Sequence, residues 1–378
     1  YPQMDRLLAS TRLKTLVVGT LGEMTAHSAA VTQQLRGAGQ LSEVAFDARH
    51  VAFANLIDND GAYTRHDIGD PRDALAVLQY TGGTTGLPKG AMLTHGNLSA
   101  ANQQYWLTST QGGANLQEGA ERFLCVLPPF HIYALSVNML LGVRLGATQI
   151  LHTRFEPEPI LKDLAAKKVT VFPGVPTMYT AINHFPGVEQ FDLRALKYCG
   201  SGGAPLPVEV HQRFMQLTGC SLSEGWGMTE TSPSGTFSPV TGPQRVGSCG
   251  LPMPGITIRF VQLDNPDAYV APGERGEIVI RGPNVMKGYW GNAAATAEAF
   301  NLDGYMRTGD VGLMDAEGYI HIVDRTKDML LCSGFNVYPR TIEEAIYAHP
   351  SVAEVCVIGI PDEYRGQSPK AFIALKAG

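Results

Sequence analysis

Residues 80–90 read Tyr80-Thr81-Gly82-Gly83-Thr84-Thr85-Gly86-Leu87-Pro88-Lys89-Gly90 and hold four glycines, three threonines and one lysine. Apolar runs flank this stretch, Ala74–Leu78 before it and Ala91–Leu93 after it. A short apolar run on each side of a glycine-rich segment is typical of two strands joined by a loop. We therefore predict a strand, a polar loop and a second strand.

The composition of this loop suits phosphate binding. Glycines allow backbone N–H groups to turn toward an anion, threonine hydroxyls donate further hydrogen bonds, and a lysine adds positive charge. A Walker A loop needs Ser or Thr directly after its lysine at the start of a helix, whereas Lys89 lies between Pro88 and Gly90. The alternative is a glycine-rich hairpin loop without a ligand.

Length and composition limit the class of protein. With 378 residues the chain exceeds the size of a single core, so at least two domains are expected. The net charge is −6 and the sequence has no run of basic residues, so a nucleic-acid partner is not expected. Six scattered cysteines without a CxxC pair favour a reduced, cytoplasmic chain. Because the chain begins with Tyr1 and not Met, we expect an N-terminal part to be missing.

Alternating strands and helices dominate residues 1–238. Continuous apolar strands between helical patterns predict a doubly wound parallel α/β sheet, which would bind ligands beyond the carboxyl ends of its strands. The predicted strands are Leu13–Gly19, Phe123–Leu127, Thr148–Leu151, Val169–Phe172 and Leu196–Cys199, and the predicted helices are Asn97–Trp106, Ile132–Leu145, Pro159–Lys168, Pro176–Phe185 and Pro207–Leu217.

The pattern changes after residue 238. Residues 239–324 show short strands between Gly and Pro and no helical pattern, which predicts a small β-barrel-like subdomain. Residues 1–324 would form one large domain, and residues 325–378 the start of a small, incomplete α+β domain. The predicted strands are Gly255–Val261, Gly276–Arg281, Gly318–Val323, Val352–Ile360 and Ala371–Leu375, and a helix is predicted to begin at Pro339.

Four more polar motifs follow the loop along the chain. They are Gly200-Ser201-Gly202-Gly203-Ala204-Pro205, Glu224-Gly225-Trp226-Gly227-Met228-Thr229-Glu230, Tyr305-Met306-Arg307-Thr308-Gly309-Asp310 and Val323-Asp324-Arg325-Thr326-Lys327-Asp328. Each also has a purely structural interpretation: a glycine-rich turn, a buried tryptophan, a turn aspartate and a charged linker. The glycines beside Trp226 argue against the second of these, because they would leave an indole face open for stacking a purine.

In order and spacing, these motifs resemble the adenylate-forming superfamily of acyl-CoA synthetases, amino-acid-activating domains and luciferases. The segment Ser333-Gly334-Phe335-Asn336-Val337-Tyr338-Pro339 most resembles bacterial medium- and long-chain fatty acyl-CoA synthetases. The resemblance implies a two-step ligase. A carboxylate attacks the α-phosphorus of MgATP to give acyl-adenylate and pyrophosphate, and CoA then displaces AMP to give acyl-CoA.

The resemblance also implies the roles of individual residues. Catalysis of adenylation would fall to Thr81, Thr84, Lys89, Thr229 and, as the Mg²⁺ ligand, Glu230. Nucleotide contacts would come from Thr81, Gly82, Gly83, Thr84, Thr85, Gly86, Lys89, Gly202, Gly203, Ala204, Gly225, Trp226, Gly227, Met228, Thr229, Asp310 and Arg325. His131 would line the gate to the acyl pocket, although a packed histidine is the alternative. Lys327 would be the hinge, and Ser333, Gly334 and Phe335 would form the CoA loop.

The acyl group and the end of the chain raise separate questions. Residues 130–137 contain no acid that could bind a substrate amine, which favours an uncharged acyl tail. Neither Lys370 nor Lys376 lies in a motif like that of the family's catalytic lysine, so we expect a fragment that holds ATP but adenylates poorly.

Two further functional hypotheses stay open. One is transfer of the acyl group to a carrier protein, and the other is nucleotide or acyl binding without turnover. A homodimer and peripheral membrane association through the lipid substrate are further expectations.

Overall fold

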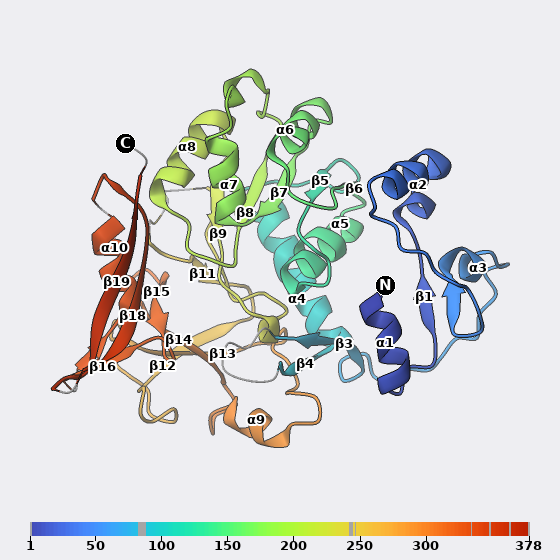
Figure 1. The fold of residues 1–378 in the computed structure, drawn as a ribbon. Coiled ribbons are helices and arrows are strands. Elements are labelled where there is room, and N and C mark those ends of the chain that lie inside the picture. The colour runs from blue at the N-terminus through green and yellow to red at the C-terminus, as the bar shows by residue number, and fades with distance from the viewer. Residues whose placement is uncertain are drawn as a thin grey trace. The chain divides into compact units, whose positions relative to one another are not determined.

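The computed structural model describes residues 2–81, 88–241, 245, 247–333, 335–347, 349–362 and 364–376. The chain divides into two compact units, Tyr1–Asp67 and Ile68–Gly378 (Figure 1).

The first unit holds short elements around one parallel strand pair. Strand β1 (Leu16–Val18) pairs in parallel with β2 (His50–Ala52). The predicted strand over residues 13–19 is therefore confirmed in its central part. The helical elements of the unit are α1 (Pro2–Ser10), a 3₁₀ turn at Leu21–Met24, α2 (Ser28–Gly37) and α3 (Phe53–Ile57).

A five-stranded parallel sheet forms the centre of the second unit, with the order β6-β5-β7-β8-β9. Consecutive strands are adjacent in the sheet except β6 and β7, which lie on opposite sides of β5. The chain runs from β5 to β6 on one side and from β7 to β8 on the other, so the strand order reverses between β5 and β7. Ligands of such sheets bind at this point, beyond the carboxyl ends of the strands. The strands are β5 (Arg122–Cys125), β6 (Thr148–Leu151), β7 (Val171–Gly174), β8 (Tyr198–Ser201) and β9 (Leu222–Glu224).

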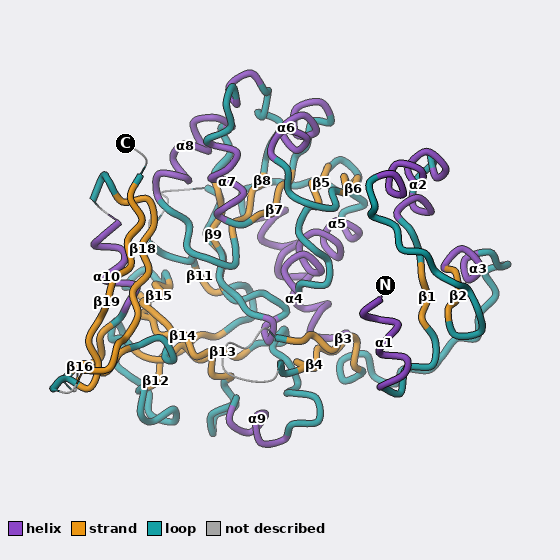
Figure 2. The backbone as a smooth tube through the Cα atoms, in the orientation of Figure 1, coloured by secondary structure: helices purple, strands orange, loops and turns teal. Residues whose placement is uncertain are grey.

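Helices cover both faces of this sheet, as Figures 1 and 2 show. Successive strand residues point to opposite faces: Phe123 packs in the cluster that includes Leu141 and Leu145, whereas Leu124 packs in the cluster that includes Phe214. The doubly wound prediction is thereby confirmed. The helices are α4 (His95–Gln111), α5 (Leu141–Arg144), α6 (Pro157–Ala166), α7 (Pro176–Asn183) and α8 (Val208–Thr218).

The helix predicted over residues 132–145 is not uniform. Residues Ala134–Leu140 wind as a π-helix and continue directly into α5. A π-helix bonds residue i to i+5 and holds more residues per turn than an α-helix.

The phosphate-loop candidate lies between two antiparallel strands, as predicted. Strand β3 (Leu75–Tyr80) pairs with β4 (Gly90–Thr94), and the register places Tyr80 opposite Gly90. The hairpin closes tightly, because the Thr81 amide donates to the Lys89 carbonyl at 2.9 Å.

The β-rich part is an antiparallel sheet of four strands in the order β12-β13-β14-β15. The expectation that residues 239–324 contain no helix is wrong: α9 (Ala293–Glu298) forms because the Asn292 side chain caps it by accepting from the Ala295 amide at 3.0 Å. Its alanine-rich sequence lacks an amphipathic pattern. The strands are β12 (Thr257–Val261), β13 (Gly276–Arg281), β14 (Met306–Met314) and β15 (Ile320–Arg325), with a separate pair β10 (Thr236–Phe237) and β11 (Leu251–Pro252).

The last elements form a second four-stranded sheet with one helix. The order is β17-β16-β19-β18, and α10 (Pro339–Tyr347) begins at Pro339 as predicted. The strands are β16 (Leu330–Cys332), β17 (Phe335–Val337), β18 (Val352–Asp362) and β19 (Gly366–Leu375). A domain boundary near residue 325 stays a prediction. Within the described ranges, none of the helices has the length and apolar character that crossing a membrane requires.

The core beneath α7 and α8 contains a tight aromatic cluster. Tyr179 and Phe214 are fully buried, with ring centroids 5.0 Å apart in an edge-to-face arrangement. The Tyr179 hydroxyl lies 2.8 Å from the carbonyls of both Phe172 and Gly200. The core thus fixes the backbone of the glycine-rich loop that follows β8.

We predict that Phe214→Ala lowers the free energy of unfolding by about 3–5 kcal/mol, because it leaves a cavity beside Tyr179. Urea unfolding measures this change. The neighbouring Met215 is 42% exposed, so Met215→Ala should change stability by no more than about 0.5 kcal/mol. Equal effects of the two substitutions would contradict the assigned core.

Candidate active site

Three of the predicted motifs follow strands of the parallel sheet at their carboxyl ends. The segment with His131 follows β5, the glycine-rich loop follows β8, and the Trp226 motif follows β9. The carboxyl ends of parallel strands meet at one edge of the sheet. The amide of Gly225 donates to the Ser201 carbonyl at 3.3 Å, which joins the last two motifs directly.

Trp226, Asp310 and Arg325 form one hydrogen-bonded group. The indole Nε1 donates to Asp310 Oδ2 at 2.8 Å, and the Arg325 Nε donates to Oδ1 at 2.8 Å. Asp310 is buried and lies inside β14, directly opposite Arg325 in the register of β14 and β15. The turn interpretation of this aspartate is therefore wrong. Both carboxylate oxygens are held by donors from separate elements.

The glycines of the Trp226 motif allow close backbone packing. A Cβ on Gly227 would lie 1.5 Å from the Pro233 carbonyl oxygen, and one on Gly225 would lie 3.0 Å from that of Thr236. Gly235, which the sequence reasoning passed over, lies under the indole: a Cβ there would be 2.7 Å from Cε3 of Trp226. Trp226 itself is half-buried, so the motif packs on one side while part of the side chain stays accessible.

Glu230 and Lys89 are connected through Tyr289, a residue that the sequence reasoning missed. The Tyr289 hydroxyl donates to Glu230 Oε1 at 2.7 Å, and the Lys89 Nζ lies 5.1 Å from the centroid of the Tyr289 ring. Glu230 is buried, whereas Lys89 is exposed. Burial, with a smaller effect of the Glu230 charge, raises the pKa of Tyr289 well above its usual value. The only signal in the sequence was an aromatic pair between glycines, Gly288-Tyr289-Trp290-Gly291.

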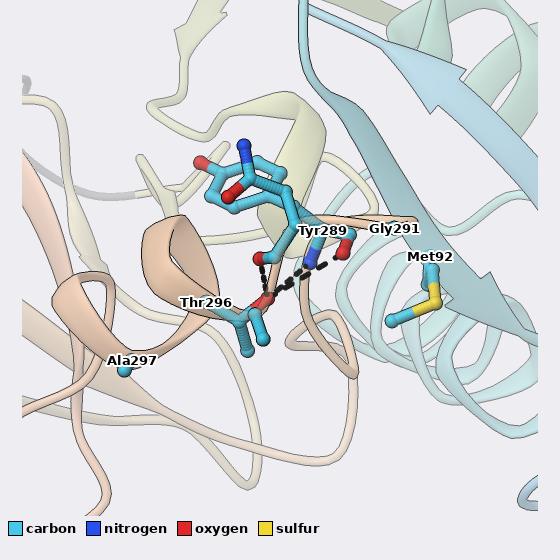
Figure 3. A pocket seen from close by; sticks show the side chains of 7 residues that line it. Met92, Tyr289, Gly291, Thr296 and Ala297 are labelled. Carbon is cyan, nitrogen blue, oxygen red and sulfur yellow. Dashed lines mark hydrogen bonds between the residues drawn. The ribbon is translucent and has the colours of Figure 1, made fainter.

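The segment around Tyr289 is paired with β4, the strand that leaves the phosphate-loop candidate. The Met92 amide donates to the Gly288 carbonyl at 2.9 Å, and the Trp290 amide donates to the Gly90 carbonyl at 2.8 Å. On the other side, the Tyr289 amide donates to Thr296 Oγ1 at 2.9 Å, as Figure 3 shows. Tyr289 also borders a surface hollow of about 500 Å³ whose wall includes Met92 and Thr296.

Tyr133, two residues after the predicted gate residue His131, contacts the glycine-rich loop. The Tyr133 hydroxyl donates to the Gly200 carbonyl at 3.1 Å, and a Cβ on Gly202 would lie 3.4 Å from the Tyr133 ring. Gly202 donates through its amide to the Gly174 carbonyl at 3.3 Å. Gly203 has φ +82°, a conformation that favours glycine, and Ala204 after it is exposed.

His131 is exposed, and its Nδ1 accepts from the Tyr133 amide at 3.3 Å. The preceding residue is tied to the hairpin, because the Gln79 side chain donates to the Phe130 carbonyl at 2.6 Å. The packed interpretation of His131 is therefore wrong. Its gate role stays a prediction.

The remaining predicted residues have separate positions. Met228 packs with the apolar cluster that contains Trp226, and Thr229 opens a 3₁₀ turn that runs to Thr231. Lys327 is exposed just after β15. Ser333 has φ +52° in the turn between β16 and β17, and Phe335 after it is 74% exposed. Gly82, Gly83, Thr84, Thr85, Gly86 and Gly334 lie outside the described residues.

The donor set fits Mg²⁺ bound together with phosphates. Within the described part of the chain, no group of three or more His, Cys, Asp or Glu side chains could hold a metal ion. Mg²⁺ is usually bound by one or two carboxylates, waters and substrate phosphates. The buried Glu230 carboxylate, connected through Tyr289 to the Lys89 ammonium, supplies a ligand of this kind.

Two protein-family models match the sequence. The AMP-binding enzyme model matches residues 2–290, and the model of the AMP-binding enzyme C-terminal domain matches residues 341–378. The chain belongs to the AMP-binding enzyme family. The resemblance drawn from the motifs is confirmed.

Curated relatives of this AMP-binding enzyme family member include acid–CoA ligases. The long-chain-fatty-acid–CoA ligase of Bacillus subtilis (strain 168) is 44% identical over 311 residues, which are 82% of the chain and 54% of the relative. The feruloyl-CoA synthase of an Amycolatopsis species is 41% identical over 303 residues, 80% of the chain and 60% of the relative. The chain thus spans about half the length of the curated relatives it matches.

Solved structures of similar enzymes confirm the fold of this family member. ATP-bound MatB from Rhodopseudomonas palustris has a TM-score of 0.81 at 29% identity, covering 99% of the chain and 71% of MatB. O-succinylbenzoate CoA synthetase from Bacillus subtilis in complex with AMP has a TM-score of 0.74 at 30% identity, covering 92% of the chain and 71% of that structure.

Glu224, at the end of β9, makes the free energy of unfolding depend on pH. Burial raises its pKa from 4.5 to about 7. A carboxyl with a raised pKa in the folded state stabilises that state at low pH, and this contribution is lost as the pH rises from 4.5 through about 7. This contribution to the free energy of unfolding is at most about 3 kcal/mol.

We predict that Glu224→Gln flattens the fall in stability over this interval, because the amide stays neutral. Urea unfolding at several pH values measures the slope. Glu209→Gln on the exposed face of α8 is the control and should keep the slope of the unsubstituted chain. An unchanged slope in Glu224→Gln would contradict the burial effect.

Proposed function

We propose that this chain forms the nucleotide-binding part of an AMP-forming acid–CoA ligase that activates a medium- or long-chain fatty acid. One observation carries the proposal. The short segment from Trp226 to Glu230 brings two buried carboxylate sites to one edge of the sheet, Asp310 at its start and Glu230 at its end. A nucleotide has a ribose at one end and phosphates at the other, so it needs one group that binds the ribose and a separate group that binds the phosphates.

At the ribose end, Asp310 accepts hydrogen bonds from the two ribose hydroxyls. A carboxylate has acceptor capacity beyond its bonds to Trp226 and Arg325. The accessible part of Trp226 stacks on the adenine. The backbone at Gly202, Gly203 and Ala204 lies along the purine and ribose, with Gly225, Gly227 and Met228 completing the wall.

At the phosphate end, catalysis is electrostatic. Lys89 and the hydroxyls of Thr81 and Thr229 would contact the triphosphate, and the same role is proposed for Gly82, Gly83, Thr84, Thr85 and Gly86. Glu230 would hold Mg²⁺, which would neutralise charge on the phosphates. The protein groups orient the α-phosphorus toward the incoming carboxylate, and pyrophosphate leaves.

In the second half-reaction the thiol of CoA attacks the acyl carbonyl and AMP leaves. Rotation about Lys327 would bring Ser333, Gly334 and Phe335 to the site, and the exposed Phe335 side chain is available for contact with CoA. The exposed His131 lines the entry of the acyl group. A carrier protein as acceptor, a homodimer, peripheral membrane association and a cytoplasmic location stay predictions.

An aromatic acid is the second candidate substrate. The 41% identity to a feruloyl-CoA synthase is close to the 44% identity to the fatty-acid ligase. Both substrate classes have an uncharged body, in agreement with the absence of an acid at residues 130–137.

The complete polypeptide, assayed for AMP release with ATP, Mg²⁺ and CoA against fatty and hydroxycinnamic acids, tests the proposal. We expect CoA-dependent turnover with fatty acids of medium or long chain. A preference for hydroxycinnamic acids would establish the second candidate. AMP release that does not depend on CoA would refute the ligase proposal.

We predict that Glu230→Gln lowers the rate of Mg²⁺-dependent adenylation about 100-fold, because the amide cannot replace a charged metal ligand. Pyrophosphate release measures this step. Glu298→Gln on α9 is the control and should leave the rate unchanged. A near-normal rate in Glu230→Gln with an unchanged melting temperature would refute its metal role.

A further inference from the structure

Tyr289 lies between the two charged groups of the phosphate end of the site. Its hydroxyl donates to Glu230 Oε1 at 2.7 Å, and its ring faces the Lys89 ammonium at 5.1 Å. The side chain therefore contacts an anion through its polar end and a cation through its π surface. These are the two protein charges that the proposed function assigns to the triphosphate and its Mg²⁺.

The hydroxyl restricts the carboxylate. The last torsion of a glutamate side chain is broad and nearly two-fold, so an unanchored Glu230 could present either oxygen in many directions. A hydrogen bond to Oε1 selects one orientation and thereby fixes the direction of Oε2. Partners that orient a metal ligand in this way commonly change metal affinity 10- to 100-fold when they are removed.

The ring restricts the lysine. A lysine side chain loses considerable rotamer entropy when it is fixed, and the face of a tyrosine ring attracts an ammonium group. Lys89 is exposed and lies at the end of the phosphate-loop candidate, directly before β4. The Tyr289 ring thus favours positions of the ammonium near Glu230 over those in solvent.

The backbone holds Tyr289 itself in place from two sides. The Gly288 carbonyl before it accepts from the Met92 amide of β4, and the Trp290 amide after it donates to the Gly90 carbonyl of β4. The amide of Tyr289 itself donates to Thr296 Oγ1 (Figure 3). Gly288 before it has φ +146°, and a Cβ there would lie 2.6 Å from Cγ2 of Thr296. The tyrosine therefore sits on a packed backbone between β4 and Thr296.

We propose that Tyr289 is a positioning residue that aligns Glu230 and Lys89 for MgATP. Tyr289 does not itself react. This inference rests on the proposed function and deepens it, because it names the residue that couples the metal ligand to the phosphate-binding lysine.

The test compares Tyr289→Phe and Tyr289→Leu in the complete polypeptide. Tyr289→Phe removes the hydroxyl but keeps the ring over Lys89. We expect it to raise the Mg²⁺ concentration for half-maximal adenylation about tenfold, while the affinity for ATP without Mg²⁺, measured by calorimetry, stays unchanged. Tyr289→Leu removes the ring as well and should weaken ATP binding without Mg²⁺ too.

Tyr269→Phe is the matched control. Its hydroxyl also contacts a carboxylate, that of Asp303, on the exposed surface, and its loss should leave the Mg²⁺ dependence unchanged. A Mg²⁺ midpoint in Tyr289→Phe within twofold of the unsubstituted protein would overturn the inference, as would an equal loss of ATP affinity with and without Mg²⁺.

Glu230→Gln separates the two levels of the argument. If Glu230→Gln removes the Mg²⁺ dependence and Tyr289→Phe does not shift it, only the role of Tyr289 is refuted. If Glu230→Gln itself leaves the Mg²⁺ dependence intact, the proposed metal site is refuted.

Discussion

A buried carboxylate is stable only when its charge is compensated by hydrogen bonds or opposite charge, and the candidate site depends on two of them. Asp310 and Glu230 are both buried, and each receives its partners from a different part of the chain. Trp226 and Arg325 hold Asp310, whereas Tyr289 holds Glu230. The partners connect the edge of the parallel sheet to the β-rich sheet, so the site exists only where both sheets are in place.

The same contacts join the separate motifs into a continuous wall. The hairpin is bonded to the segment before His131 through Gln79, and Tyr133 at the start of the following helix is bonded to the glycine-rich loop at Gly200. That loop is bonded to the Trp226 motif through backbone groups. Most of these bonds end on carbonyl oxygens, which are present whatever the side chain. The wall therefore depends on the positions of these carbonyls and on the donor side chains of Gln79 and Tyr133, and glycines occur where two backbones approach closely.

Sequence reasoning succeeded where the signal is local. The strands β5 to β8 lie on or beside short runs rich in apolar residues, and helix α10 begins at a proline, so both were predictable. Strand β9 has a single apolar residue, Leu222, and escaped notice. Helix α9 escaped because alanines give no amphipathic pattern. Tyr289 could not be found, because its partner Glu230 is 59 residues away and only the fold brings the two together.

The π-helical winding of residues 134–140 depends on the number of residues in this segment, because a π-helix holds more residues per turn than an α-helix. Deleting one residue there would let the segment wind as an α-helix, which has fewer residues per turn, and would shift the residues before it relative to Leu141. The shift would disturb the hydrogen bonds that Tyr133 donates to Gly200 and Gln79 donates to Phe130. Within this family, single-residue insertions and deletions in this segment should therefore be rare, and the buried Ser136 and Asn138 should resist substitution because they donate to the carbonyls of Ser232 and Leu124.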